Sequence, residues 1–164
     1  MKYPYLPVVL FLFFACNNAD DATLRQNRID SLQQKTAATY KPGFGEFMLA
    51  IQAHHSKLWF AGKNNNWRLA DFEMNEIGEL VEDIRKYETD RTETEKIIMI
   101  QPAIDSVNNA IQSKDQKRFK SSFTLLTNTC NNCHHAVNFE FNVVKIPETS
   151  PFTNQDFSVK DTAH

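Results

Sequence analysis

The feature that most constrains the fold is a pentapeptide late in the chain, Cys130-Asn131-Asn132-Cys133-His134. Two thiols three residues apart lie on one helical turn, where they can reach the two vinyl groups of one porphyrin, and the next residue places an imidazole under the iron. The motif therefore predicts one covalent c-type haem, attached through Cys130 and Cys133, with His134 as the proximal iron ligand. A dithiol redox pair would require a βαβ context, which this sequence lacks, and half of a zinc site would require two further ligands, which no second Cys pair supplies.

Composition limits what else the chain can be. It has 164 residues, of which 41% are hydrophobic and 12% aromatic, enough for one domain with a packed core. The 18 basic and 20 acidic residues are dispersed, so there is no basic stripe to neutralise phosphates, and nucleic acid is not an expected partner. The sequence contains no nucleophile–base triad, phosphate loop or nucleotide fingerprint, and we expect no enzyme activity of the protein by itself.

The N-terminus predicts export and a lipid anchor. An apolar block over residues 8–14 leads to Ala15-Cys16, which is the layout of a bacterial lipoprotein signal peptide over residues 1–15. The cysteine in such a signal becomes the lipidated N-terminus, so Cys16 is the predicted lipidation site of a periplasmic or outer-face protein bound to a membrane. The alternative is an ordinary cleaved signal that leaves Cys16 as a free thiol. Residues 16–41 are mostly polar and predict a lipidated tether with at most one short, frayed helix.

Apolar residues at three- and four-residue spacing predict four helices in the centre of the chain. The first covers about 44–61, and the second starts from a cap at Asn66. The third either starts afresh near Pro102 or bends there, because proline removes a backbone donor. The fourth follows a capping box formed by Ser113 and Gln116 and carries the haem motif near its C-terminal end.

Beyond the fourth helix the sequence pattern changes. Apolar and polar residues alternate after Asn138, and Pro147 and Pro151 prevent a continuing helix. Residues 139–157 therefore predict an extended strap over the helices, whose aromatic side chains can shield the porphyrin, and residues 158–164 predict a disordered tail. The predicted fold class is all-α, an up-down-up-down four-helix bundle with an extended C-terminal strap, which together make the cytochrome c domain at 42–157.

The sixth iron ligand depends on where the fourth helix ends. Met48 and His55 share the apolar stripe of the first helix, about 20° apart in angle and about 10 Å apart along its axis, so only one can reach the iron. The first and fourth helices of such a bundle are antiparallel. A fourth helix that ends near Asn138 places His134 opposite Met48, whereas one that runs to Lys145 places it opposite His55. The change of pattern after Asn138 favours Met48, with His55 as the alternative.

Two other groups of residues have ordinary structural interpretations. Glu73, Glu76 and Glu79 predict a solvated face of the second helix rather than an acid–base pair. Trp59 and Trp67 flank the connection between the first and second helices, and they predict packing of that corner rather than an electron relay.

The predicted arrangement, four amphipathic helices with a haem motif late on the last one, resembles that of cytochrome c-prime and its non-covalent b-type relative. These proteins are four-helix bundles that hold haem between the end of the fourth helix and the first. This resemblance covers about 44–137, and the long segment after the motif is the chief departure from it. The strings HSKLWFAG at 55–62, NWRLADFE at 66–73 and PFTNQDF at 151–157 are also similar to those of a group of small exported bacterial c-type cytochromes.

The expected function is one-electron transfer between redox partner proteins outside the cytoplasm, by a membrane-anchored monohaem cytochrome c. The alternative, which the resemblance to cytochrome c-prime implies if the iron is five-coordinate, is a gas-binding or gas-sensing haem protein. An accessory subunit of a larger oxidoreductase is a third possibility, which the sequence does not separate from the first.

Overall fold

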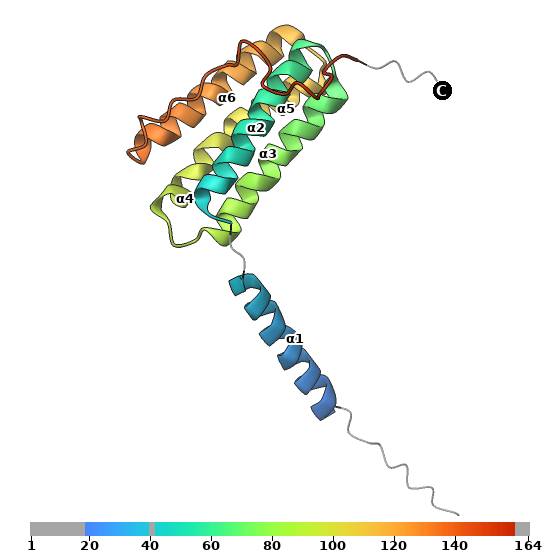
Figure 1. Ribbon diagram of the computed structural model, residues 1–164, viewed down its shortest axis with the longest axis vertical. Helices are drawn as coiled ribbons and strands as arrows, with labels where there is room; N and C mark the ends of the chain where they lie inside the picture. Colours follow the sequence, from blue (N-terminus) through green and yellow to red (C-terminus); the bar gives the residue numbers. More distant parts are fainter. Residues whose placement is uncertain (1–18, 40–41, 160–164) are drawn as a thin grey trace, which may run out of the picture. The chain divides into compact units, whose positions relative to one another are not determined.

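The computed structural model describes residues 19–39 and 42–159 (Figure 1). All regular secondary structure in these two stretches is helical, which confirms the predicted all-α class. No helix in the described stretches combines the length and the apolar character that a membrane crossing requires.

The chain divides into two units, Met1–Lys41 and Pro42–His164. The predictions for the signal peptide, for lipidation at Cys16 and for the tail from residue 160 onward concern positions outside the described residues.

The described part of the first unit is one helix, α1 (Ala19–Thr39). The prediction of at most one short, frayed helix is therefore wrong about its length, because α1 has 21 residues. No Gly or Pro interrupts this stretch, and side chains four residues apart pair on its surface: Arg25 with Asp21, and Gln26 Nε2 with Asp30 Oδ1 at 2.9 Å. The side chains described from 21 to 36 are all exposed, so local interactions rather than burial hold this helix.

The second unit begins with α2 (Phe44–Lys63) and α3 (Trp67–Tyr87), and the end of α2 lies two residues beyond its predicted limit. A tight turn joins them, in which Asn65 has a positive φ of 58°. Asn66 caps α3 as predicted, because its side chain accepts a hydrogen bond from the Leu69 N–H at 3.2 Å. The buried face of α3 follows the predicted period, with Ala70, Met74, Ile77, Val81 and Ile84.

The third predicted helix is divided into three parts. A short α4 (Thr92–Lys96) leads into a 3₁₀ turn, η1 (Ile97–Ile100), and then into α5 (Gln101–Gln112). Pro102 lies in the first turn of α5, so the helix starts afresh at the proline, which confirms the first of the two alternatives.

The last helix, α6 (Gln116–Ala136), does not begin with the predicted capping box. Asp115 is the cap, and its carboxylate accepts a hydrogen bond from the Arg118 N–H at 2.9 Å. The hydroxyl of Ser113 instead donates to the Asn109 carbonyl at 2.8 Å, at the end of α5. The predicted cap, Ser113, is therefore wrong: Asp115, two positions later, is the side chain that caps α6.

The helices α2, α3, α5 and α6 lie side by side (Figure 1), with α3 packed against both α2 and α5, and α6 packed against the same two helices. Aromatic side chains fill the interior where α2 meets α6. Phe119 and Phe123 are fully buried, and the ring centroids of Trp59 and Phe123 lie 4.9 Å apart. Trp67 meets Phe119 edge-on at 6.0 Å, so both tryptophans pack at this corner, as predicted.

After α6, residues 137–159 form turns but no helix or strand, and the segment returns alongside the helices (Figure 1). Two of its aromatic side chains are held by α2. The Phe152 ring lies 5.1 Å from Lys57 Nζ, and Phe157 is buried with its ring centroid 5.6 Å from that of Phe60. The Asn66 amide, which caps α3, also donates to the Phe157 carbonyl at 3.4 Å.

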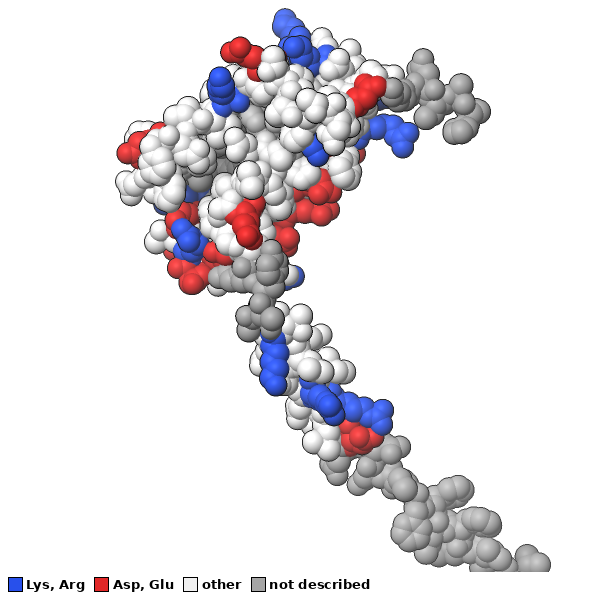
Figure 2. Space-filling view, in the orientation of Figure 1, with Lys and Arg blue, Asp and Glu red and all other residues white. Residues whose placement is uncertain are grey.

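On the face of the second unit in Figure 2, many of the visible acidic side chains lie towards the end that carries α4. Uncharged atoms cover much of the rest of that face. The basic side chains visible on that face lie apart from one another.

Candidate cofactor site

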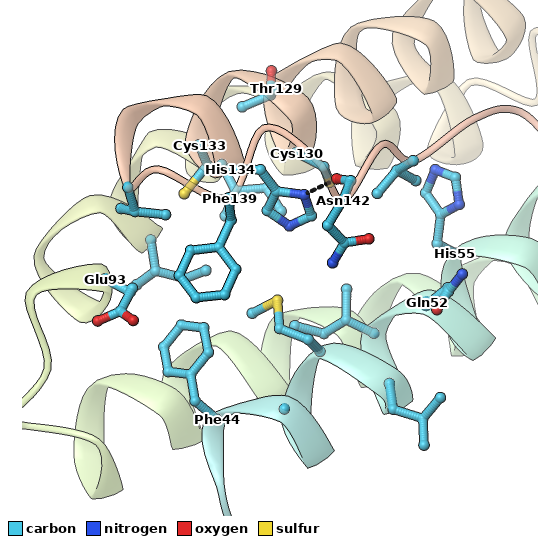
Figure 3. Close-up of a pocket in the computed structure, with 18 of the residues that line it drawn as sticks. Phe44, Gln52, His55, Glu93, Thr129, Cys130, Cys133, His134, Phe139 and Asn142 are labelled. Carbon is cyan, nitrogen blue, oxygen red and sulfur yellow. Dashed lines mark hydrogen bonds between the residues drawn. The ribbon is translucent and has the colours of Figure 1, made fainter.

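The predicted haem motif lies on the last turns of α6, where the helix ends in a defined backbone arrangement. Asn138 has a positive φ of 62°, its N–H donates to the His135 carbonyl at 3.3 Å, and the Phe139 N–H donates to the His134 carbonyl at 2.8 Å. These two bonds form a Schellman motif, and asparagine accepts the left-handed conformation more readily than most residues. The helix therefore stops two residues after His134, and Phe139 turns back towards the motif (Figure 3).

A cavity of about 400 Å³ lies against this end of α6 (Figure 3). Its volume falls in the range of roughly 300–1,000 Å³ that is usual for small-molecule sites. Most of its walls are apolar and come from α2, η1, α6 and the segment after α6. The lining includes every residue that the sequence predicts as a haem or iron ligand: Cys130, Cys133, His134, Met48 and His55.

Cys130 and Cys133 are free, partly buried thiols that border this cavity. Burial, together with the neighbouring Cys133, raises the pKa of Cys130 to about 12, and burial also raises the pKa of Cys133. Cys130 therefore stays protonated at neutral pH, and Cys133 is less ionised than an ordinary thiol. A catalytic dithiol needs a thiolate stabilised at low pKa, so these environments disfavour the redox-pair interpretation.

The imidazole of His134 is held by a backbone carbonyl. Its Nδ1 lies 2.7 Å from the oxygen of Asn142, marked by the dashed line in Figure 3. A carbonyl oxygen can only accept, so Nδ1 carries a proton, and Nε2 is the ring nitrogen that remains to bind a metal. Such a bond fixes the ring and makes the free nitrogen more basic. Sequence reasoning missed Asn142, because any residue type can offer a backbone carbonyl.

The alternative ligand, His55, is already bonded inside the protein. Its side chain is 3% exposed, and its Nε2 lies 2.9 Å from the Thr127 hydroxyl oxygen. That hydroxyl donates its own proton to the Phe123 carbonyl at 3.0 Å, so it accepts from Nε2–H of His55. Burial lowers the pKa of His55 to about 4, which keeps the imidazole neutral at physiological pH. This nitrogen can bind iron only after the bond to Thr127 breaks.

Met48 borders the same cavity from the beginning of α2, four residues after the helix starts at Phe44. The end of α6 at Ala136 is the shorter of the two possibilities weighed from the sequence, and it is the one that places Met48 opposite His134. The identity of the sixth ligand stays a prediction, and the helix lengths favour Met48.

One acidic side chain outside the cavity corrects the sequence interpretation. Glu73 was expected on a solvated face, but it is 1% exposed, and its Oε2 lies 2.6 Å from Nδ1 of His54. The other ring nitrogen of His54 lies 3.9 Å from the Glu76 carboxylate. A buried carboxylate requires such a partner, so the pair joins α3 to α2. In residues 19–39 and 42–159, no group of three or more His, Cys, Asp or Glu side chains is arranged to hold a metal ion by itself.

The chain matches no protein-family model, no curated protein and no solved structure. The donor groups around the cavity indicate which cofactor such a site can hold. These are two thiols one helical turn apart, an imidazole held by a backbone carbonyl through its Nδ1, a thioether from a second helix, and apolar walls. This donor set fits a covalently attached haem.

Proposed function

We propose that the chain is an exported, membrane-anchored c-type cytochrome that carries single electrons between redox partner proteins. The observation that supports it most is the convergence of Cys130, Cys133 and His134 on one apolar cavity, with Met48 from the beginning of α2 bordering the same space. Residues about eighty positions apart in sequence thus supply the thiols, the imidazole and the thioether that one haem site needs.

In this proposal each residue has a defined role. Cys130 and Cys133 form the two thioether bonds, His134 binds the iron through Nε2, and Met48 is the sixth ligand, with His55 as the alternative. The bound haem supplies reversible one-electron chemistry. The chain sets the potential through the axial ligands, through the Asn142 carbonyl that holds His134, and through apolar walls that limit access of water.

We also infer the finer topology: an up-down-up-down bundle of α2, α3, α5 and α6, with residues 139–157 as a strap. The turn at Asn65 supports an antiparallel α2 and α3, and α6 packs against both α5 and α2, as a closed bundle requires. The contacts of Phe152 and Phe157 with side chains of α2 support the strap.

A carrier must meet protein partners close to its cofactor, and exposed apolar residues at the cavity support this. Phe141 is 78% exposed and Val143 is 71% exposed. They alternate with Phe139, Asn142 and Val144, which line the cavity. Exposed apolar side chains gathered beside a site are typical of surfaces that protein partners cover.

The mass and the spectrum of the exported protein test the proposal. Intact mass after acid extraction should show one haem that is retained through Cys130 and Cys133, and the double Cys→Ala variant should lose it. His134→Ala should lose the low-spin absorption spectrum. His135→Ala is the matched control, because His135 is the exposed neighbour of His134 and should leave the spectrum unchanged.

A mass equal to that of the bare polypeptide would refute the proposal. If the haem is present but the wild-type ferrous protein binds carbon monoxide rapidly, the iron has an open sixth position. The function would then be that of the gas-binding alternative rather than that of an electron carrier.

A further inference from the structure

The side chain of Asn131, inside the Cys-x-x-Cys-His motif, is bonded to a residue outside α6. Its Nδ2 donates to the Val144 carbonyl at 2.8 Å, and its Oδ1 accepts from the Val144 N–H, also at 2.8 Å. The amide thus pairs with both backbone groups of one residue, as a neighbouring strand would. Asn132, the next residue of the same motif, is exposed.

Val144 lies two residues beyond Asn142, whose carbonyl accepts the Nδ1–H of His134. The other end of this short loop is fixed by the Schellman motif, in which the Phe139 N–H donates to the His134 carbonyl at 2.8 Å. Residues 137–144 are therefore held at both ends by α6. Within them, the Asn142 carbonyl lies against the imidazole of His134 (Figure 3), two residues before the backbone groups of Val144 that pair with Asn131.

We propose that Asn131 is a positioning residue, which clamps the loop at Val144 so that the Asn142 carbonyl holds the proximal imidazole of His134. This inference rests on the proposed function, since it assigns Asn131 a part in setting the potential of the same haem. A hydrogen bond from Nδ1–H makes the imidazole a stronger electron donor, and a stronger donor favours the oxidised iron. The clamp therefore lowers the reduction potential, and loosening it raises the potential.

The test compares Asn131→Ala with Asn132→Ala in the full-length exported protein. Asn131→Ala removes both bonds to Val144, so the Val144 amide should exchange with deuterium about tenfold faster, which corresponds to about 1.4 kcal/mol. The reduction potential should rise by about 28 mV, which for one electron corresponds to about a threefold increase in the ratio of reduced to oxidised protein. Asn132→Ala should change neither quantity.

Asn131→Asp is a second variant of nearly the same shape, for the case in which the alanine variant does not fold. It keeps the oxygen that accepts from the Val144 N–H but replaces the donor to the Val144 carbonyl. Its Val144 amide should exchange faster than in the wild type and more slowly than in Asn131→Ala. Equal exchange in wild type and Asn131→Asp would show that the donor half of the clamp contributes nothing, and it would overturn the inference.

The two measurements separate the possible failures. If Asn131→Ala accelerates exchange but leaves the potential unchanged, Asn131 only anchors the loop and the inference is wrong. A similar rise in potential for Asn132→Ala would also overturn it, because the effect would then belong to the motif in general. If no haem is attached to the wild-type protein, the proposed function fails, whereas the exchange comparison still decides whether Asn131 clamps Val144.

Discussion

Gly62 near the end of α2 leaves the space that a buried aromatic ring occupies. A Cβ added there would lie 2.2 Å from two ring atoms of Phe119, whereas ordinary contacts begin at about 3.4 Å. Phe119 is fully buried and is surrounded by the rings of Trp59, Trp67 and Phe123, so it has little room to move away. Overpacking of this kind costs about 1–3 kcal/mol, and the better helix propensity of alanine returns at most about 1 kcal/mol.

We therefore expect Gly62→Ala to lower the free energy of unfolding by about 1–2 kcal/mol. For a unit of this size, 1 kcal/mol corresponds to roughly 4 °C in Tm. Gly78→Ala is the matched control, because a Cβ at this helical glycine of α3 meets nothing within 4 Å, and it should raise the stability by about 0.5–1 kcal/mol. Urea titration and thermal melts followed by circular dichroism measure both. If the two variants shift stability in the same direction, the close packing of Phe119 on Gly62 is refuted.

Three further predictions concern the anchor, the iron and pH. Cys16→Ser should release the protein from the membrane or leave it unprocessed, as fractionation would show, and unchanged membrane association would place the anchor elsewhere. Met48→Ala should abolish the weak long-wavelength sulfur-to-iron absorption band and open the ferrous haem to carbon monoxide; loss of the native spectrum in His55→Ala instead would assign the ligand to His55. The pKa of His55 is about 4 in the folded protein, whereas its ordinary value is 6.5. Between these two pH values the unfolded chain binds more protons than the folded one, so the free energy of unfolding falls as the pH falls from 6.5 to about 4. Urea titrations at pH 7 and pH 5 should show a loss of about 2 kcal/mol that His55→Gln removes, and an equal loss in that variant would contradict the assignment.

The helices were predictable because their burial is periodic. The apolar stripe of α3 reappears as its buried face, and Asn66 caps that helix as its side-chain chemistry indicates. The length of α1 was not predictable in this way, because its described side chains are exposed and no burial pattern marks its limits. Its intrahelical pairs, such as Gln26 with Asp30, are a weaker signal that the sequence did contain.

The residues proposed as ligands could be named from residue type, whereas their hydrogen-bond partners could not. Two thiols followed directly by a histidine at this spacing favour haem attachment over the other chemistries of a Cys pair. The partner of His134 is a backbone carbonyl, and the partner of His55 is Thr127, 72 positions away, so both depend on how α6 packs and ends. The burial of Glu73 was not predicted for a similar reason. The residue that bonds its buried carboxylate, His54, lies on another helix.

The way in which α6 ends also determines which backbone group bonds His134. Because Asn138 adopts a positive φ, the chain leaves the helix and returns past the imidazole of His134, with Phe139 on the cavity wall. In a helix that continued to Lys145, the carbonyl of Asn142 would point along the helix axis towards a backbone N–H four residues later. It could not then accept the Nδ1–H of His134, and the proposed proximal ligand would lose the group that fixes its tautomer.

The same helix end also decides which side chain stands opposite the proposed iron ligand. With α6 ending at Ala136, His134 lies about half a turn from the end and faces the first turns of α2, where Met48 borders the cavity. A longer α6 would instead bring His134 opposite His55, whose Nε2 is bonded to Thr127 and whose imidazole is buried. Methionine is a weaker donor to oxidised iron than histidine and gives a higher reduction potential. Within the proposed function, the end of α6 directly after the motif thus favours His134 and Met48 as the two axial ligands, a pair that suits an electron carrier.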